Sequence, residues 1–179
     1  MIKEKIQHDQ HFLLSKETAL ASIHAANLKK EDMVLEIGPG KGILTKELAK
    51  HCQKVIAVEI DEKLKSELSK LSKNVEIIFG NVLELLPRLR FNKIVANIPY
   101  SISEPLLKRM LKLKIDCAVL LVGNSFYELL ENHESKWSAI SKLFYSIEKI
   151  QDVPRTEFEP KPRTDSVLIK ILPRTESLS

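Results

Sequence analysis

The chain of 179 residues fits a single domain, since domains hold roughly 100 to 200 residues. Hydrophobic residues make up 44% of the sequence and charged residues 29%, a composition that excludes disorder over most of its length. The longest uninterrupted apolar run, Cys117–Val122, is far shorter than the ~20 residues of a membrane-spanning helix. A net charge of +4 permits a polyanionic partner without requiring one.

The N-terminal segment and the cysteine content bear on location. Residues Met1–Gln10 are charged and polar, without the apolar core or cleavage site of a secretory signal. Only two cysteines occur, Cys52 and Cys117, as expected for a reducing compartment. We therefore expect a cytoplasmic protein without membrane association.

Strand-like and helix-like segments alternate from residue 33 onward. Met33–Ile37 is a β-rich run that ends at glycines, and Lys41–Lys50 carries apolar residues at helical spacing. The pattern repeats in strand Val55–Glu59 and helix Asp61–Leu71, for which Asp61 is the expected N-cap. The later elements are strand Val75–Phe79, a turn through Pro87, strand Lys93–Asn97, helix Ser103–Leu113, strand Cys117–Val122, helices Asn124–His133 and Lys136–Phe144, strand Ser146–Val153, a rigid loop Pro154–Pro162 and strand Ser166–Leu172.

This alternation predicts an α/β fold. Five strands separated by crossover segments predict a parallel sheet with helices on both faces, and the last two strands bring a mostly parallel sheet to seven. No linker or repeat interrupts the pattern. We therefore expect one domain over residues 1–179.

The segment Glu36–Gly42, with sequence EIGPGKG, links the first strand to the first helix. Glycines let the backbone approach a ligand, and a helix N-terminus presents free N–H groups, so this loop predicts a nucleotide-like ligand. Ligands of such sheets bind beyond the carboxyl ends of the strands. Glu36, Glu59, Asn81 and Asn97 all lie at predicted strand ends.

Glu59 follows Gly38 by 21 residues, the position from which a carboxylate binds a ribose hydroxyl. This spacing suits NAD and S-adenosylmethionine equally. A dinucleotide fingerprint requires a glycine at position 43, which is Ile43 here, so the loop favours S-adenosylmethionine. A purely structural turn is the alternative.

The segment Asn97-Ile98-Pro99-Tyr100 follows the fourth strand. An Asn-x-Pro sequence can be a simple turn, but at a strand end it also places polar and aromatic groups at the ligand crevice. The Asn97 side-chain oxygen and the Ile98 carbonyl, held by Pro99, could accept hydrogen bonds from the exocyclic amine of adenine. Tyr100 would stack on the base.

A second aromatic residue, Phe158, lies in the proline-stiffened segment Phe158–Pro162. It could stack on the other side of the same base. The alternative is that Phe158 anchors its loop to the core.

The ordered motifs resemble those of the ribosomal RNA adenine dimethyltransferases, which form N6,N6-dimethyladenosine near the 3′ end of small-subunit RNA. The resemblance runs from Gln7 to Pro173 and implies a Rossmann-like S-adenosylmethionine-dependent methyltransferase fold. The motifs are Gln10-His11-Phe12-Leu13, Glu36–Gly42, Val58-Glu59-Ile60-Asp61, Asn97–Tyr100 with Ser101 and Ser103, and Phe158 through Asp165-Ser166 to Pro173.

The resemblance implies roles for individual residues. His11, Leu13, Gly38 and the neighbouring Gly40 and Glu36 would lie on the cofactor, with Glu59 on its ribose and Asn81 on its adenine. Asn97, Pro99, Tyr100 and Phe158 would hold the target base, and Asn97 would contact the cofactor as well. His8 and His11 form H-x-x-H without further ligands, so we expect no metal.

Three features depart from the family pattern. Asn81 replaces the usual Asp, and Asn still offers an acceptor to an adenine amine. Val122-Gly123-Asn124 replaces a Gln-Lys-Glu segment, which puts RNA contacts there in doubt. The family continues into a helical C-terminal domain, which we expect to be absent because the sequence stops at Ser179.

Basic residues suggest where RNA would bind. One group, Lys108, Arg109, Lys112 and Lys114, lies on and after the helix that begins at Ser103, where a solvated helix face is the alternative. A second group, Arg155, Lys161 and Arg163, flanks Phe158.

The predicted function is S-adenosylmethionine-dependent dimethylation of adenosine N6 in small-subunit ribosomal RNA, by an enzyme that is a monomer and binds the precursor of the small ribosomal subunit. A large-subunit ribosomal RNA adenine N6-methyltransferase shares the same motifs. A binding module that has lost catalysis is another alternative. An NAD-dependent oxidoreductase is disfavoured by Ile43.

Overall fold

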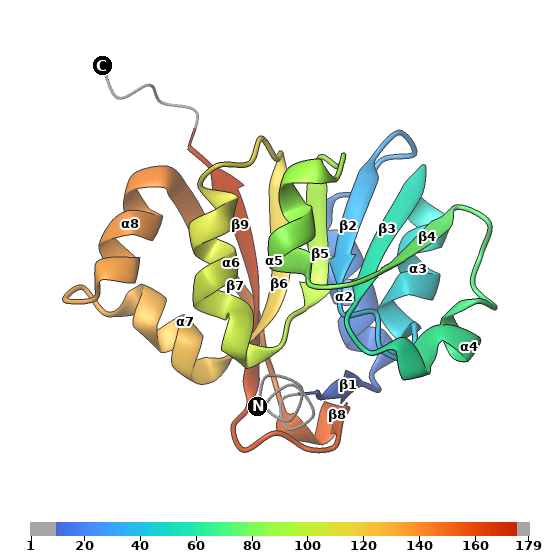
Figure 1. Cartoon of the computed structure of the whole chain (residues 1–179). Coiled ribbons are helices and arrows are strands. Elements are labelled where there is room, and N and C mark those ends of the chain that lie inside the picture. The colour runs from blue at the N-terminus through green and yellow to red at the C-terminus, as the bar shows by residue number, and fades with distance from the viewer. Residues whose placement is uncertain (1–9, 175–179) are drawn as a thin grey trace.

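The computed structural model describes residues 10–174 and contains a seven-stranded sheet flanked by helices (Figure 1). The strand order is β4-β3-β2-β5-β6-β9-β7, in which β2 to β6 are parallel and β9 is antiparallel to both of its neighbours. The predicted α/β class and mostly parallel seven-stranded sheet are therefore confirmed. The strands are β2 (Met33–Ile37), β3 (Lys54–Glu59), β4 (Val75–Phe79), β5 (Lys93–Asn97), β6 (Cys117–Gly123), β7 (Tyr145–Val153) and β9 (Ser166–Pro173).

Helices cover both faces of this sheet (Figure 1). Helices α2 and α3 pack on one face, and α5 to α8 pack on the other. Within residues 10–174, no helix is long and apolar enough to cross a membrane. The helices are α2 (Lys16–Ala26), α3 (Ile43–His51), η1 (Glu62–Leu64), α4 (Lys65–Leu68), α5 (Val82–Leu85), η2 (Leu86–Arg88), η3 (Tyr100–Ile102), α6 (Ser103–Met110), α7 (Asn124–Glu131), α8 (Lys136–Phe144) and η4 (Arg155–Glu157).

The alternation of side chains along β2 builds the two halves of the core. Val34 is buried against α2 and α3, whereas Leu35 and Ile37 are buried against the opposite layer. Successive side chains of a strand point to opposite faces, so a central strand covered on both sides has to be apolar at nearly every position. Glu36 is the exception in β2, and its position directs it to the face covered by α2 and α3.

Most predicted elements match the structure within a few residues, and four regions differ. The predicted helix Asp61–Leu71 is η1 followed by the short α4, with the Asp61 carboxylate accepting from the Lys63 N–H at 3.1 Å as the predicted cap. The predicted turn through Pro87 contains α5 and η2, since Pro is compatible with a first helical turn.

Helix α2 was not predicted from the sequence, although its ends carry clear signals. The Ser15 hydroxyl caps it by accepting from the Thr18 N–H at 3.1 Å, and Asn27 ends it in the left-handed conformation with φ 46°. Ser is a preferred N-cap and Asn is tolerated in left-handed backbone, so both residues suit these positions.

A small second sheet joins two distant parts of the chain. Strand β1 (Phe12–Leu13) pairs antiparallel with β8 (Phe158–Glu159), and the Leu14 N–H adds a bond of 2.8 Å to the Glu157 carbonyl. The predicted rigid loop Pro154–Pro162 therefore contains a strand. This pairing brings the N-terminal motif and the proline-rich loop together below the large sheet (Figure 1).

Candidate functional site

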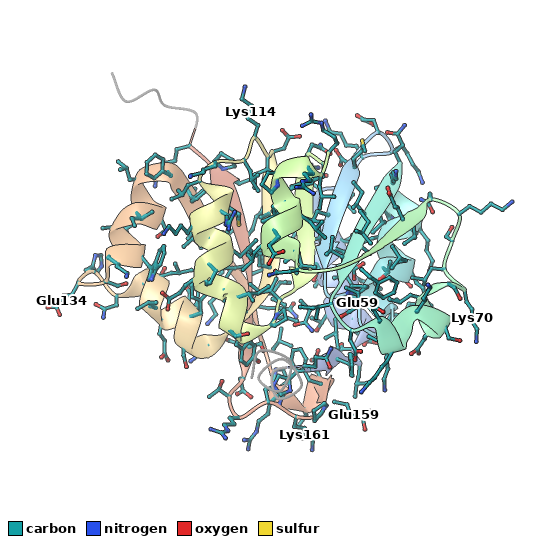
Figure 2. The ribbon with its side chains drawn as sticks, in the orientation of Figure 1. Glu59, Lys70, Lys114, Glu134, Glu159 and Lys161 are labelled. Atoms are coloured by element: carbon teal, nitrogen blue, oxygen red, sulfur yellow. The ribbon has the colours of Figure 1, made fainter. Side chains whose placement is uncertain are left out.

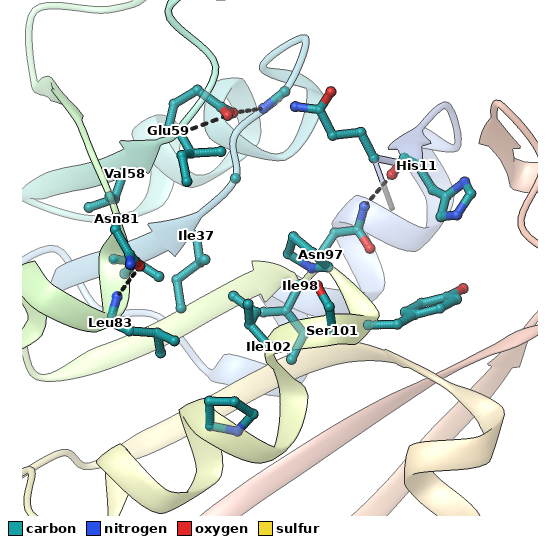
Figure 3. A pocket seen from close by; sticks show the side chains of 18 of the residues that line it. His11, Ile37, Val58, Glu59, Asn81, Leu83, Asn97, Ile98, Ser101 and Ile102 are labelled. Atoms are coloured by element: carbon teal, nitrogen blue, oxygen red, sulfur yellow. Dashed lines mark hydrogen bonds between the residues drawn. The ribbon is translucent and has the colours of Figure 1, made fainter. Parts of the chain in front are cut away.

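A pocket of about 360 Å³ lies where the carboxyl ends of β2, β3, β4 and β5 meet the loops that follow them (Figure 3). Most of its wall is apolar. Glu59 is its one carboxylate and neither Lys nor Arg lines it, among the residues that the structure describes. The lining residues are Gln10, His11, Phe12, Ile37, Gly38, Gly40, Val58, Glu59, Ile60, Gly80, Asn81, Val82, Leu83, Asn97, Ile98, Pro99, Tyr100, Ser101, Ile102 and Pro105.

The glycine loop forms one wall of the pocket. Gly38 and Gly40 have φ values of +67° and +54°, a region that residues with a side chain rarely adopt. A Cβ atom at Gly40 would lie 2.6 Å from Cδ1 of Phe12. Glycine therefore allows the loop and the N-terminal segment to approach each other closely.

Glu59 lies at the end of β3 and is only 3% exposed. Its Oε1 accepts hydrogen bonds from the N–H groups of Ile60 at 2.8 Å and Asp61 at 2.9 Å. Its Oε2 accepts from the Gly40 N–H at 3.2 Å, a bond drawn in Figure 3. Three backbone donors thus hold the carboxylate in one orientation at the pocket wall.

Apolar side chains from the ends of β2 and β3 face the same space, namely Ile37, Val58 and the partly exposed Ile60. Asn81 lies beside them and caps α5, since its Oδ1 accepts from the Leu83 N–H at 3.1 Å (Figure 3). Its Nδ2 donates to Glu84 at 2.9 Å. Asn81 lines the pocket as expected, while its contact with a cofactor adenine stays a prediction.

Asn97 ends β5 at the rim of the pocket. Its Nδ2 donates a hydrogen bond of 2.9 Å to the main-chain carbonyl of His11 (Figure 3). The Ile98 N–H donates to the Leu121 carbonyl at 3.2 Å, which extends the sheet pairing into the Asn-Ile-Pro-Tyr segment. The position of Asn97 is therefore set by a buried strand on one side and by the N-terminal segment on the other.

Tyr100 lies three residues after Asn97, at the start of η3. Its hydroxyl and that of Ser166 are 2.7 Å apart, at hydrogen-bond distance, and its ring covers Gly123, where a Cβ atom would lie 3.1 Å from the ring. The ring of His11 is 5.7 Å from the Tyr100 ring, centroid to centroid, and His11 Nδ1 is 2.7 Å from the Pro160 carbonyl oxygen. The β1–β8 sheet thus packs beside the rim of the pocket.

Three predicted site residues do not line the pocket. Leu13 is buried in the core, because the alternation of β1 places Phe12 on the pocket side and Leu13 on the opposite one. Phe158 is only 1% exposed and packs in the same part of the core. The expected stacking of Phe158 on a base is therefore not met here, and Phe158 anchors its loop.

Glu36 is the third predicted site residue that does not line the pocket. Its side chain points to the face of the sheet that is covered by α2 and α3. Its side chain is completely buried, and its Oε2 has no hydrogen-bond partner among the described residues. Burial is the main cause that raises the pKa of Glu36 to about 8; the Thr45 hydroxyl lowers this pKa and the charge of Glu59 raises it, both by less. Direct contact with a cofactor is excluded in this conformation.

The predicted basic residues lie at two ends of the molecule (Figure 2). Arg155, Lys161 and Arg163 are exposed in the loop around β8, where Arg155 Nη1 donates to the Arg163 carbonyl at 3.3 Å. The group on and after α6 is at the opposite end, where Lys114 projects. Within residues 10–174 no cluster of potential metal ligands occurs, and His8 lies outside these residues.

The family model described as "Ribosomal RNA adenine dimethylase" matches residues 1–179. The chain belongs to this family. A probable ribosomal RNA small subunit methyltransferase A from Methanococcus aeolicus is 40% identical to this chain in an alignment that covers 94% of this chain. The chain spans 66% of that relative, and the same share of a second one from Methanopyrus kandleri that is 38% identical.

Solved structures of methyltransferases match as well. A dimethyladenosine transferase from Plasmodium falciparum is 34% identical with a TM-score of 0.85, covering 92% of this chain and 64% of its own. The 23S rRNA methyltransferase ErmE is 30% identical with a TM-score of 0.83, covering 94% of this chain and 72% of its own. The fold is therefore that of the S-adenosylmethionine-dependent methyltransferases.

Family and fold imply S-adenosylmethionine as the cofactor, and the lining residues of this dimethylase-family pocket fit it. The pocket volume falls within the range of about 300 to 1,000 Å³ that small-molecule sites occupy. Gly38 and Gly40 permit close approach of a ligand to backbone, and Glu59 presents an oriented carboxylate. The walls formed by Ile37, Val58 and Ile60 suit a flat base.

Sequence reasoning missed several pocket residues of this dimethylase-family site. Phe12 and Gln10 belong to a motif that the sequence does indicate, but nothing in the sequence places that motif against the glycine loop. Ile60 could have been found, because a residue directly after a strand-end carboxylate lies at the same crevice. It is 43% exposed and lines the pocket.

Proposed function

We propose that this chain transfers methyl groups from S-adenosylmethionine to the N6 nitrogen of adenosines in small-subunit ribosomal RNA. The observation that carries the proposal is the placement of Asn97 at the pocket rim. Its amide nitrogen is committed to the His11 carbonyl, so its oxygen is available to a ligand. In this proposal the described residues act as one catalytic domain.

The chemistry requires a better nucleophile than free adenine provides, because the N6 lone pair is delocalised into the ring. The Asn97 oxygen and the Ile98 carbonyl would each accept one N6 hydrogen and direct the lone pair toward the methyl group. Tyr100 would stack on the base and hold it in line. For each methyl group, the N6–C bond would form as the S–C bond of the cofactor breaks, S-adenosylhomocysteine would leave, and the methylated N6 would release one proton to water. The second transfer would start from an N6 that keeps one hydrogen, so only one of the two acceptors would then be used.

When bound, S-adenosylmethionine supplies an electrophilic methyl group on a positively charged sulfur. Glu59 would bind its ribose, and the carboxylate is already oriented by three backbone N–H groups. Because neither Lys nor Arg lines the pocket in the described part of the chain, nothing there opposes a cationic cofactor. Asn81 would accept a hydrogen bond from the cofactor adenine.

Methyl transfer from labelled S-adenosylmethionine to small ribosomal subunits that lack dimethyladenosine tests the proposal. We expect label in N6-methylated and N6,N6-dimethylated adenosine after digestion to nucleosides. The Asn97→Ala variant provides the matched control. Tight cofactor binding with no transfer to subunits or free RNA would instead support a binding module without catalysis.

A large-subunit substrate is the second candidate, and the likeness to a 23S rRNA methyltransferase is the observation that favours it. Both substrates present an adenine to the same residues, so the pocket itself does not separate them. Mapping the modified nucleotide after reaction with each purified subunit separates the two substrates. Modification restricted to the large subunit would overturn the small-subunit assignment.

A further inference from the structure

A second concave surface, the basic groove, lies at the opposite end of the sheet from the catalytic pocket. Its volume is about 820 Å³. It is formed by the end of η2, the entry to β5 and the end of α6 with the turn that follows. The basic groove is lined by Glu31, Met33, Leu86, Pro87, Leu89, Arg90, Phe91, Asn92, Arg109, Lys112, Leu113 and Lys114.

Four exposed cations and one carboxylate line the basic groove. Within residues 10–174, no ion pair involves Arg90, Arg109, Lys112 or Lys114. The lining therefore carries a surplus of three positive charges, compared with +4 for the whole chain. A ligand that neutralises these four cations would have to be an anion with several charges.

The neighbouring carboxylates offset at most one charge of this surplus, that of the exposed Asp116. Asp32 is buried and pairs with Lys93, whose Nζ lies 2.9 Å from it. Asp116 is exposed but is not part of the lining, and it accepts from the Asn92 amide at 2.8 Å. The remaining lining is largely apolar, and a cleft with low-dielectric walls and charges of one sign focuses its field on the ligand.

Helix α6 connects the basic groove to the catalytic pocket. Pro105 lines the pocket, whereas Arg109 lines the groove. Both residues are exposed and stand at i and i+4, so they share one face of the helix about 6 Å apart along its axis. A large ligand that lies on this face can contact the pocket and the groove together.

We propose that the basic groove binds the sugar–phosphate backbone of the RNA substrate, away from the target adenosine. This inference rests on the proposed function. The pocket lining holds no Lys or Arg among the described residues, so the charge that attracts RNA has to lie elsewhere. The basic groove supplies four cations, and on α6 its lining residue Arg109 follows the pocket residue Pro105 by one helical turn.

The test compares two variants that each remove two positive charges. The groove variant is Arg109→Gln/Lys112→Gln, and the control is Lys46→Gln/Lys70→Gln, two exposed lysines that line neither cavity. Binding of a fluorescent small-subunit RNA fragment is measured by anisotropy from about 50 to 200 mM salt. Circular dichroism melting confirms that both variants are folded.

We expect the groove variant to bind the fragment at least about tenfold more weakly at the lowest salt, with a slope of log affinity against log salt reduced by about 1.5. The loss should appear in the KM for the fragment rather than in kcat. A short oligonucleotide that reaches only the pocket should show equal KM values in all three proteins.

Equal affinities for the groove and control variants would overturn this inference, as would an equal loss on the short oligonucleotide. An acidic protein as the true occupant of the groove would give the first of these results. Failure of the proposed function gives a different pattern, since the wild-type chain would then methylate no RNA. Groove-dependent RNA binding remains measurable in that case, because anisotropy requires no methyl transfer.

Discussion

The side-chain amide of Asn97 donates a hydrogen bond of 2.9 Å to the main-chain carbonyl of His11, a residue 86 positions earlier in the chain. An amide has one donor end and one acceptor end, so committing the nitrogen to His11 fixes which way the oxygen faces. The N-terminal motif therefore sets the orientation of the residue on which the proposed chemistry depends.

Replacing Asn97 with Ala should reduce kcat for RNA methylation by about 10² to 10³, the usual cost of removing one preorganised hydrogen-bonding group. Cofactor affinity should change little, because Glu59 and the glycine loop are left in place. Single-turnover methyl transfer and calorimetry measure the two effects separately. Near-full activity in this variant would refute the account of base positioning.

Replacing Glu59 with Gln should weaken cofactor binding about tenfold to hundredfold, since charged hydrogen bonds contribute about 1.5 to 3 kcal/mol. The amide also brings an N–H donor against the N–H groups of Gly40 or of Ile60 and Asp61. Calorimetric titration with S-adenosylmethionine checks this, with the exposed Glu62→Gln as control. Unchanged affinity would remove Glu59 from the cofactor site.

Replacing Gly40 with Ala should destabilise the fold by about 2 to 5 kcal/mol. A left-handed backbone costs a residue with a side chain about 1 to 2 kcal/mol, and the new methyl group would lie 2.6 Å from Phe12. Urea unfolding measures the loss. Adding Phe12→Leu should recover only the steric part, and full recovery would show that backbone strain contributes nothing.

Phe158 allows its two predicted roles to be separated. Phe158→Ala should cost about 3 to 5 kcal/mol in unfolding free energy, because a large buried side chain leaves a cavity. Phe158→Leu keeps most of the buried volume and should remain folded with near-normal kcat. A folded Leu variant with greatly reduced kcat would instead restore Phe158 to the base-binding site.

The large sheet and the carboxyl-end crevice could be predicted because their signals are local. Strand β5 reads as an apolar run, and the positions of Glu59 and Asn97 follow from the rule that parallel strands end at one edge. Ligand-contacting residues at those ends therefore follow from the sequence. Helix α2 carried the same kind of local signal at Ser15 and Asn27, so it was predictable and was missed.

The β1–β8 sheet could not be predicted in this way. Two-residue strands have no measurable periodicity, and the pairing of Leu13 with Phe158 joins segments far apart in sequence. Without knowledge of that pairing, the sequence allows Leu13 to contact the cofactor and Phe158 to contact the base. The pairing places both side chains in the core. The predicted contact of Glu36 with the cofactor is not met for a different reason. The position of a residue at a strand end predicts the edge of the sheet at which it lies, but not the face to which its side chain points.

Replacing Glu36 with Gln should alter how stability depends on pH. In the folded chain this carboxyl holds its proton up to a pKa of about 8, whereas its ordinary pKa is 4.5. Between these values the folded state binds a proton that the unfolded state has lost, so Glu36 lowers the unfolding free energy as pH rises, by up to about 1.4 kcal/mol per pH unit. The Gln variant lacks this contribution, and its stability relative to wild type should therefore grow from pH 5 to pH 8. Urea unfolding of both proteins across that range measures the difference, with the exposed Glu67→Gln as control. A difference that stays constant with pH would show that Glu36 is ionised in the folded chain.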